Sequence, residues 1–105
     1  MKRVKRRYLA LRLDGDYTPS DREFLDAIWV SVSRLFGEYG ASLTSLALIT
    51  YDCERRGAIL RANLSTMDNV RAALATITVI NGKPVVIHVT AVSGTIKALR
   101  EKSHL

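Results

Sequence analysis

The chain has 105 residues, 48% of them hydrophobic, which is enough for one domain with a single core. Its one cysteine, Cys53, excludes an internal disulfide and a cysteine-based metal site. Because no apolar run reaches about 18 residues, we expect a soluble, cytoplasmic protein without a membrane partner.

The formal net charge of +6 is distributed unevenly along the chain. Residues 1–12 carry six basic residues and no acidic one, and residues 13–54 carry eight acidic residues against two basic ones. Residues 55–105 return to eight basic residues against two acidic ones. We therefore expect a polyanion to meet the N-terminal arm and the C-terminal half. Terminal Lys and Arg that only keep a small protein in solution are the alternative interpretation.

The first half of the chain predicts a strand followed by a long helix. Residues 8–13 alternate between leucine and other side chains, as in a half-buried strand. A turn-rich segment follows, and Ser20 with Glu23 has the spacing of a capping box that opens a helix. Apolar residues then recur every three or four positions over about five turns. Gly37 and Gly40 are the predicted places where this helix ends.

The second half predicts a hairpin, a helix and a further strand. Residues 43–51 and 57–63 are apolar runs joined by a short polar connection, which favours an antiparallel hairpin. Ser65 is the predicted cap of a second helix, which the Asn-Gly pair at 81–82 ends. Residues 85–92 form the most β-prone segment of the chain.

Residues 95–102 predict a short third helix at the end of the chain. The order βαββαβ followed by a helix is the α+β, ferredoxin-like arrangement that RNA-recognition motifs share, in which two helices cover one face of a four-stranded antiparallel sheet. We expect a basic arm over residues 1–7 and one domain over residues 8–105. The other sheet face is predicted to display Tyr8, Arg12, Ile49, Tyr51, Ile59, Arg61, Val86 and His88. That face is too apolar to be bare, so the C-terminal helix or a partner should cover part of it.

No group of residues in the sequence predicts catalysis. His88 lies inside a predicted strand and His104 near the C-terminus, and neither has a Cys or His at metal-ligand spacing. Ser65 and Ser93 stand at predicted helix starts, where capping explains them. We therefore expect no catalytic residue, no metal ligand and no cofactor in the protein itself.

Two features of the sequence indicate that RNA, if bound, is held through its phosphate groups. The third strand of an RNA-recognition motif carries stacking aromatics, but residues 56–61 contain none, so base stacking is not expected there. Free backbone N–H groups beside Gly94 can bind an anion at a helix start, although capping alone would account for the same spacing. The predicted RNA-binding residues are Lys2, Arg3, Lys5, Arg6, Arg7, Arg61, Ser93, Gly94, Thr95, Lys97 and Arg100.

Short motifs spread over nearly the whole chain match a known family. They are Arg7-Tyr8, Ala27-Ile28-Trp29, residues 35–41, 57–61 and 80–84, and, most specifically, residues 92–100. On these residues the chain resembles protein component 2 of archaeal and eukaryotic ribonuclease P.

The resemblance implies a subunit of the endoribonuclease that removes the 5′ leader of precursor tRNA. An RNA is then the catalyst, with Mg²⁺ as the metal of that RNA. The implied partners are ribonuclease P RNA, precursor tRNA, ribonuclease P protein component 3 and other protein subunits. A sequence-tolerant RNA-binding module of another ribonucleoprotein is the main alternative. An acylphosphatase-like hydrolase is disfavoured because residues 14–19 contain no arginine, and a ligand-sensing domain would leave the basic arm without a purpose.

Overall fold

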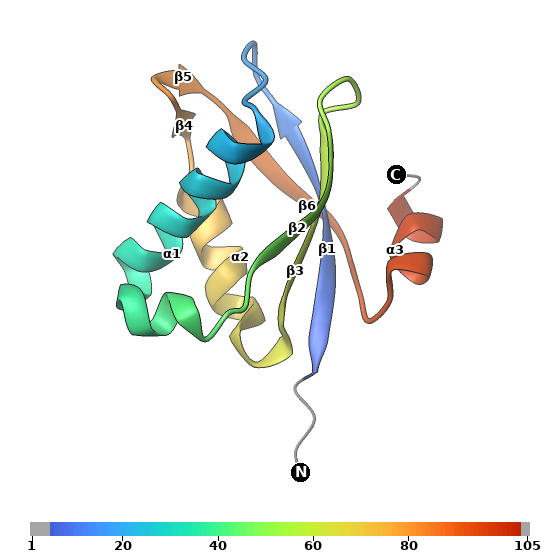
Figure 1. Cartoon of the computed structure of the whole chain (residues 1–105). Helices are drawn as coiled ribbons and strands as arrows, with labels where there is room; N and C mark the ends of the chain where they lie inside the picture. The colour runs from blue at the N-terminus through green and yellow to red at the C-terminus, as the bar shows by residue number, and fades with distance from the viewer. Residues whose placement is uncertain (1–4, 104–105) are drawn as a thin grey trace.

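The computed structural model describes residues 5–103 of the chain (Figure 1). Its elements are β1 (Arg6–Asp14), α1 (Asp21–Ser42), β2 (Ala47–Asp52), β3 (Gly57–Asn63), a 3-10 turn η1 (Leu64–Thr66), α2 (Met67–Thr76), the short strands β4 (Val79–Ile80) and β5 (Lys83–Pro84), β6 (Val86–Ser93) and α3 (Ile96–Ser103). The predicted hairpin strand 57–63 and the third helix are present. β1 begins two residues before its predicted start, so Arg6 and Arg7 pair with β3.

The main sheet is antiparallel and has the order β2-β3-β1-β6, which confirms the predicted ferredoxin-like arrangement. Figure 1 shows α1 and α2 on one side of this sheet and α3 on the other. The alternation of β1 explains this layering, because its odd-numbered leucines face α1 and α2 while its even-numbered residues face the opposite side. The core between the sheet and the two helices includes Leu9, Leu11, Leu13, Phe24, Ile28, Val32, Leu60, Val70 and Leu74.

The start of α1 is held by the predicted capping box. Ser20 Oγ accepts a hydrogen bond from the backbone N–H of Glu23 at 3.2 Å, and the Glu23 carboxylate accepts from the Ser20 N–H at 3.0 Å. The Tyr17 hydroxyl also donates to this carboxylate, at 2.8 Å. The backbone bond from Ser20, followed by the bond from Tyr17, lowers the pKa of Glu23 below its ordinary value. The first helix therefore begins with a fixed negative charge.

The first helix breaks at Gly37, one of its two predicted end points, but it does not end at Gly40. Gly37 has φ 76° and ψ 169°, which breaks the helix locally, but helical structure resumes and continues to Ser42. Ala41 is buried in this last segment and is part of the core. Packing of Ala41 therefore outweighs the stop signals of Gly37 and Gly40, and the first glycine makes a kink instead.

The predicted boundaries of the second helix are also wrong at both ends. Ser65 is exposed within the 3-10 turn and does not cap α2, which begins at Met67. The turn is held because the Leu64 N–H donates to the Lys5 carbonyl at 2.8 Å. At the other end α2 stops at Thr76, and residues 81–82 form the turn between β4 and β5.

The hairpin of β4 and β5 requires positive φ angles in its turn. Asn81 and Gly82 have φ of 53° and 76°, and positive φ at both central residues is the condition for the tightest hairpin turn that fits twisted strands. An Asn-Gly pair satisfies this condition better than any other natural pair. Asn81-Gly82 therefore indicates a turn between two strands, not the end of a helix.

A change of register turns Tyr51 to the face opposite the one predicted. The pairing of β2 with β3 shifts between Leu48 and Thr50, so Tyr51 lies opposite Ala58 and faces the helices. Its ring packs against Phe24, with centroids 5.4 Å apart, and its hydroxyl donates to the Pro19 carbonyl. One extra residue in a strand moves every later side chain to the other face, and simple alternation cannot anticipate it.

The C-terminal helix covers the middle of the other sheet face, where the sequence left a choice between this helix and a partner. Leu99 of α3 is 0% exposed and packs against Ala10 and Ile59, with Tyr8 and Ala91 at the edges of this cluster. Ile59 lies on the face where the sequence predicts it, but α3 buries it there. Among the helices of residues 5–103, none combines the length and apolar character that a membrane span requires.

Truncation of Leu99 should release α3 from the sheet. We expect Leu99→Ala to lower the free energy of unfolding by about 2–5 kcal/mol, since it leaves a cavity over Ala10 and Ile59. Amide hydrogen exchange should rise in α3 before it rises in α1. Leu35→Ala is the matched control, because Leu35 is 46% exposed in a helix and its truncation should change stability by only about 0.5 kcal/mol. Equal losses in the two variants would contradict the packing described for α3.

The Tyr51 phenol should make stability fall at alkaline pH. Burial raises its pKa from the ordinary 10.0 to about 12, and nearby acidic groups add to the effect. The folded protein therefore holds this proton more tightly than the unfolded chain does. Its contribution is complete below pH 10.0 and is lost as the pH rises toward about 12.

Denaturant unfolding on either side of the ordinary tyrosine pKa measures this contribution. Tyr51→Phe should flatten the alkaline loss of stability, whereas Tyr39→Phe should not, because Tyr39 is 79% exposed. The same alkaline slope in the wild type and in Tyr51→Phe would show that another group is responsible.

Candidate nucleic-acid interface

The predicted RNA-binding residues gather at one end of the sheet. Figure 1 shows the start of β1, the end of β3 and the connection from β6 to α3 at this end. The register agrees, because Tyr8 lies opposite Arg61 on one side and Ser93 on the other. We call this end, with Lys5, Arg6, Arg7, Arg61, Ser93, Gly94, Thr95, Lys97 and Arg100, the basic end. Lys2 and Arg3 lie outside the described residues.

Arg7 joins the first strand to the connection before α3. Its guanidinium donates to the Arg6 carbonyl at 3.1 Å and lies against Gly94. A Cβ built on Gly94 would stand 3.4 Å from Arg7 Nη1, at the limit of an ordinary van der Waals contact. Arg7 and Gly94 are therefore neighbours, a pairing that the sequence did not reveal.

The start of α3 is capped by Thr95. The Thr95 hydroxyl accepts a hydrogen bond from the Ala98 N–H at 3.2 Å, as an N-cap side chain does. Ser93 accepts only a long contact, 3.5 Å, from the Thr95 N–H. The cap predicted at Ser93 thus lies two residues later.

Lys97 and Arg100 project from α3 into solvent. Both are exposed, and no described acidic side chain forms an ion pair with either. They lie on the helix that is anchored through Leu99, so their positions are fixed relative to the sheet. These two cations are available to an anionic partner without breaking an internal contact.

Arg61 has a more constrained position in the middle of the basic end. It is half-buried on β3, opposite Tyr8 and Ala47. Its Nε is buried, and no described oxygen accepts from it. Since a buried unsatisfied N–H is costly, the Nε–H of Arg61 has unused hydrogen-bonding capacity.

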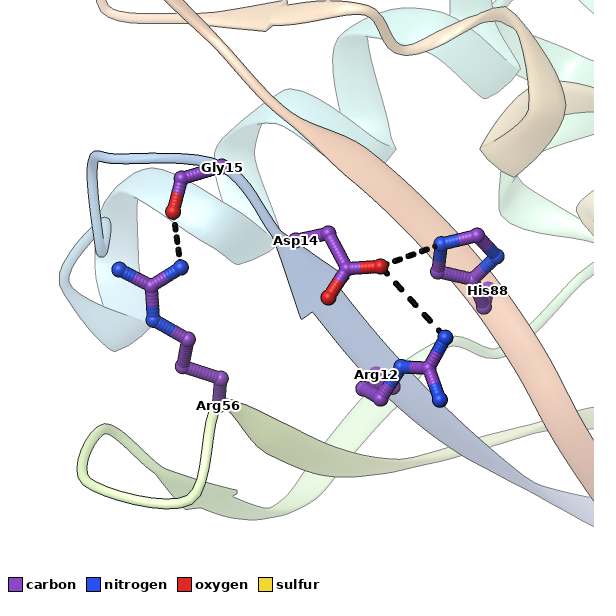
Figure 2. A network of polar contacts seen from close by, with 5 residues as sticks. All are labelled: Arg12, Asp14, Gly15, Arg56 and His88. Atoms are coloured by element: carbon purple, nitrogen blue, oxygen red, sulfur yellow. Dashed lines mark hydrogen bonds and ion pairs between the residues drawn. The ribbon is translucent and has the colours of Figure 1, made fainter.

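The opposite end of the sheet holds basic residues that are already paired (Figure 2). Asp14 Oδ2 lies 2.8 Å from His88 Nε2 and 3.5 Å from Arg12 Nη2. The guanidinium of Arg56 donates to the Gly15 carbonyl. Sequence reasoning placed Arg12 and His88 on one face but missed the carboxylate between them. The signal was available, because Asp14 follows Arg12 by two residues and so shares its face in a strand.

The two ends of the sheet therefore differ in free charge. At the basic end most cations lack an acidic partner among the described residues, whereas at the other end Asp14 offsets Arg12. The acidic residues of α1 lie on the far side of the sheet from α3. Residues 5–103 hold no cluster of three side chains suited to a metal ion. The arrangement can bind phosphate groups.

Comparisons with known proteins show which family the chain belongs to. Ribonuclease P protein component 2 of Pyrococcus abyssi is 35% identical over 100 residues, which are 95% of this chain and 85% of that protein. The protein of the same name from Methanosarcina barkeri is also 35% identical, over 95% of this chain and 73% of its own length.

Among solved structures, a chain in a cryo-EM structure of yeast ribonuclease MRP superposes with a TM-score of 0.72. It covers 90% of this chain and 78% of its own length at 13% identity, so it bears on the fold alone. The family model described as Rpp14/Pop5 matches residues 7–104. With nearly its whole length matched, and with relatives named ribonuclease P protein component 2, the chain belongs to the Rpp14/Pop5 family.

Proposed function

We propose that this chain is an RNA-binding protein subunit of ribonuclease P that assists a catalytic RNA in removing the 5′ leader of precursor tRNA. Membership of the Rpp14/Pop5 family supports the assignment to ribonuclease P. The observation that carries the RNA-binding role is the basic end, where unpaired cations from β1, β3 and α3 lie together.

The way in which α3 packs determines how RNA would be bound. Leu99 fills the middle of the sheet face over Ala10 and Ile59, the region where RNA-recognition motifs stack bases. Bases therefore have no aromatic platform there, and contact falls to Arg and Lys side chains and backbone N–H groups. Such contacts bind phosphates and give affinity and positioning with little reading of sequence.

Catalysis by the RNA is part of the same proposal. The basic end presents cations, which suits a subunit that lowers repulsion between RNA segments. Mg²⁺ would serve the RNA catalyst, with the protein contributing phosphate neutralisation. Ribonuclease P RNA, precursor tRNA, ribonuclease P protein component 3 and other protein subunits are the proposed partners. The proposed location is the cytoplasm.

A sequence-tolerant role in another ribonucleoprotein is the second candidate. The same basic end favours it, because phosphate contacts do not specify one RNA. The two functions differ in whether the chain stimulates leader removal by ribonuclease P RNA.

Reconstitution tests the proposed function. The pure chain with labelled precursor tRNA and Mg²⁺ should release no leader, whereas adding it to ribonuclease P RNA and the other protein subunits of its source organism should raise the cleavage rate. Omission of this chain from the full mixture is the control. Leader removal by the chain alone that is lost on changing its own side chains would contradict catalysis by RNA. A full rate without the chain would favour the second candidate.

Lys97 and Arg100 of α3 should contribute to RNA affinity but not to the stability of the fold. Replacing Lys97 and Arg100 with alanine should weaken RNA binding by about 1–3 kcal/mol, the scale of hydrogen bonds to charged groups. The melting temperature should hardly change, because both side chains are exposed and Leu99 and Thr95 remain.

The matched control is Arg22→Ala with Arg71→Ala, which removes two exposed cations from the helices on the other side of the sheet. RNA affinity measured at fixed salt should fall only in the first variant. Equal affinity in both double variants would leave the α3 residues without an RNA contact.

A further inference from the structure

An aromatic side chain lies among the cations of the basic end. Of the two aromatic residues in the strands of the main sheet, Tyr51 faces α1 and α2, whereas Tyr8 lies on the side of α3. The register places Arg61 of β3 opposite Tyr8 on one side and Ser93 of β6 on the other. Directly opposite residues share one face of a sheet. Tyr8 therefore has a guanidinium beside it on one strand and a hydroxyl on the next.

Tyr8 lies between the apolar wall of α3 and the free start of its strand. Two residues further along β1, Ala10 is buried under Leu99, and Tyr8 packs against the edge of this cluster but stays partly exposed. Two residues in the other direction, Arg6 is exposed and forms no ion pair with a described acidic residue. Proteins bind single-stranded nucleic acid with this combination of an accessible aromatic ring and unpaired cations.

The polar groups of Tyr8 and Arg61 are not used inside the described part of the fold. Neither the Tyr8 hydroxyl nor the Arg61 guanidinium forms a hydrogen bond or ion pair with any of residues 5–103. The Nε of Arg61 is buried as well as unsatisfied, which costs free energy. Groups that a fold retains at a cost to its stability are typical of functional sites. An external ligand accounts for this pair better than stabilisation of the sheet does.

The pair fits one unpaired nucleotide. The base can stack on the ring of Tyr8, and the phosphate of the same nucleotide can accept hydrogen bonds from Arg61. A base inside a duplex is stacked on its neighbours and cannot reach the ring. An acidic peptide would satisfy the arginine but brings no flat group for the ring at a fixed distance from its charge. Every nucleotide carries both groups, so the ligand is single-stranded RNA.

We infer that Tyr8 and Arg61 form a site for one unpaired nucleotide, with the base stacked on Tyr8 and the phosphate bound by Arg61. The inference rests on the proposed function in one respect, that RNA is the ligand of the basic end. It adds a base contact to the phosphate contacts derived above. Because every base has a flat face, the site distinguishes single strands from duplexes rather than one base from another.

Substitutions of Tyr8 test the base contact. The full chain is titrated with an oligouridylate and with an RNA duplex of equal phosphate number at the same salt concentration. Tyr8→Leu keeps an apolar contact with Leu99 and should weaken binding of the single strand by about fivefold or more, which corresponds to at least about 1 kcal/mol for one stacked base. Its affinity for the duplex should not change.

Two control variants separate stacking from other effects. Tyr8→Phe keeps the flat ring and should bind both RNAs as the wild type does. Tyr39→Leu removes an aromatic ring that is 79% exposed on α1, and it should also leave both affinities unchanged. Equal losses for single strand and duplex in Tyr8→Leu, or the same single-strand loss in Tyr8→Phe, would overturn the inference.

Photochemical cross-linking of the unmodified chain tests the same contact without a substitution in the fold. An oligouridylate that contains 5-iodouridine is bound to the chain and irradiated, because this base cross-links to aromatic side chains that it stacks on. Mass spectrometry should locate the new bond at Tyr8 and not at the more exposed Tyr39. A bond at another residue, or no bond although the RNA is bound, would overturn the inference.

Arg61→Met tests the phosphate contact. It keeps an unbranched stem and removes the charge together with the buried, unsatisfied N–H, so the melting temperature should stay the same or rise. The slope of log affinity for the single strand against log salt concentration should flatten by about 0.7. Arg71→Met, on an exposed position of α2, is the matched control. A lower melting temperature with an unchanged slope would show that Arg61 is structural and would overturn the inference.

The reconstituted ribonuclease P reaction distinguishes failure of this site from failure of the proposed function. If leader removal depends on the chain but Tyr8→Leu binds single strands as the wild type does, the nucleotide site is refuted and the proposed function stands. If leader removal does not depend on the chain, the proposed function itself is refuted.

Discussion

Burial of β1 on both faces is the constraint on which the other layers depend. Leu9, Ala10 and Leu11 are each no more than 1% exposed, although neighbouring residues in a strand point to opposite sides. The leucines require α1 and α2 on one side, and Ala10 requires α3 on the other. Without the third helix, the sheet face around Ala10 and Ile59 would be an exposed apolar patch.

This double burial also separates the chemical roles of the sheet. A sheet whose middle is filled by Leu99 can offer only its ends and edges to ligands. At the start of β1 the cations lack acidic partners among the described residues, while at its end Asp14 pairs with Arg12 and His88. The same strand therefore presents free charge at one end and compensated charge at the other, and phosphate binding is favoured where the cations are unpaired.

Three residues, Gly94, Thr95 and Leu99, fix the position of α3 at the basic end. Gly94 lies beside the guanidinium of Arg7, in the connection to α3. Thr95 then caps α3, and Leu99 anchors it one turn later. Backbone, cap and anchor together position Lys97 and Arg100, so charge placement at this end follows from packing rather than from the exposed residues themselves.

The sequence by itself determined the fold class, the four strands of the main sheet and the capping box at Ser20. These follow from periodicity and local hydrogen bonding, which neighbouring residues specify. It also identified most cations of the basic end, because excess charge is a property of composition.

Only the tertiary structure decided the kink at Gly37, the face on which Tyr51 lies and the contact of Arg7 with Gly94. Each depends on residues far apart in the chain. The register shift in β2 is a property of two strands, and the helix past Gly37 persists because Ala41 is buried. For residues other than proline, local helix preferences amount to about 1 kcal/mol or less per residue, and burial of a large side chain in a shared core exceeds them.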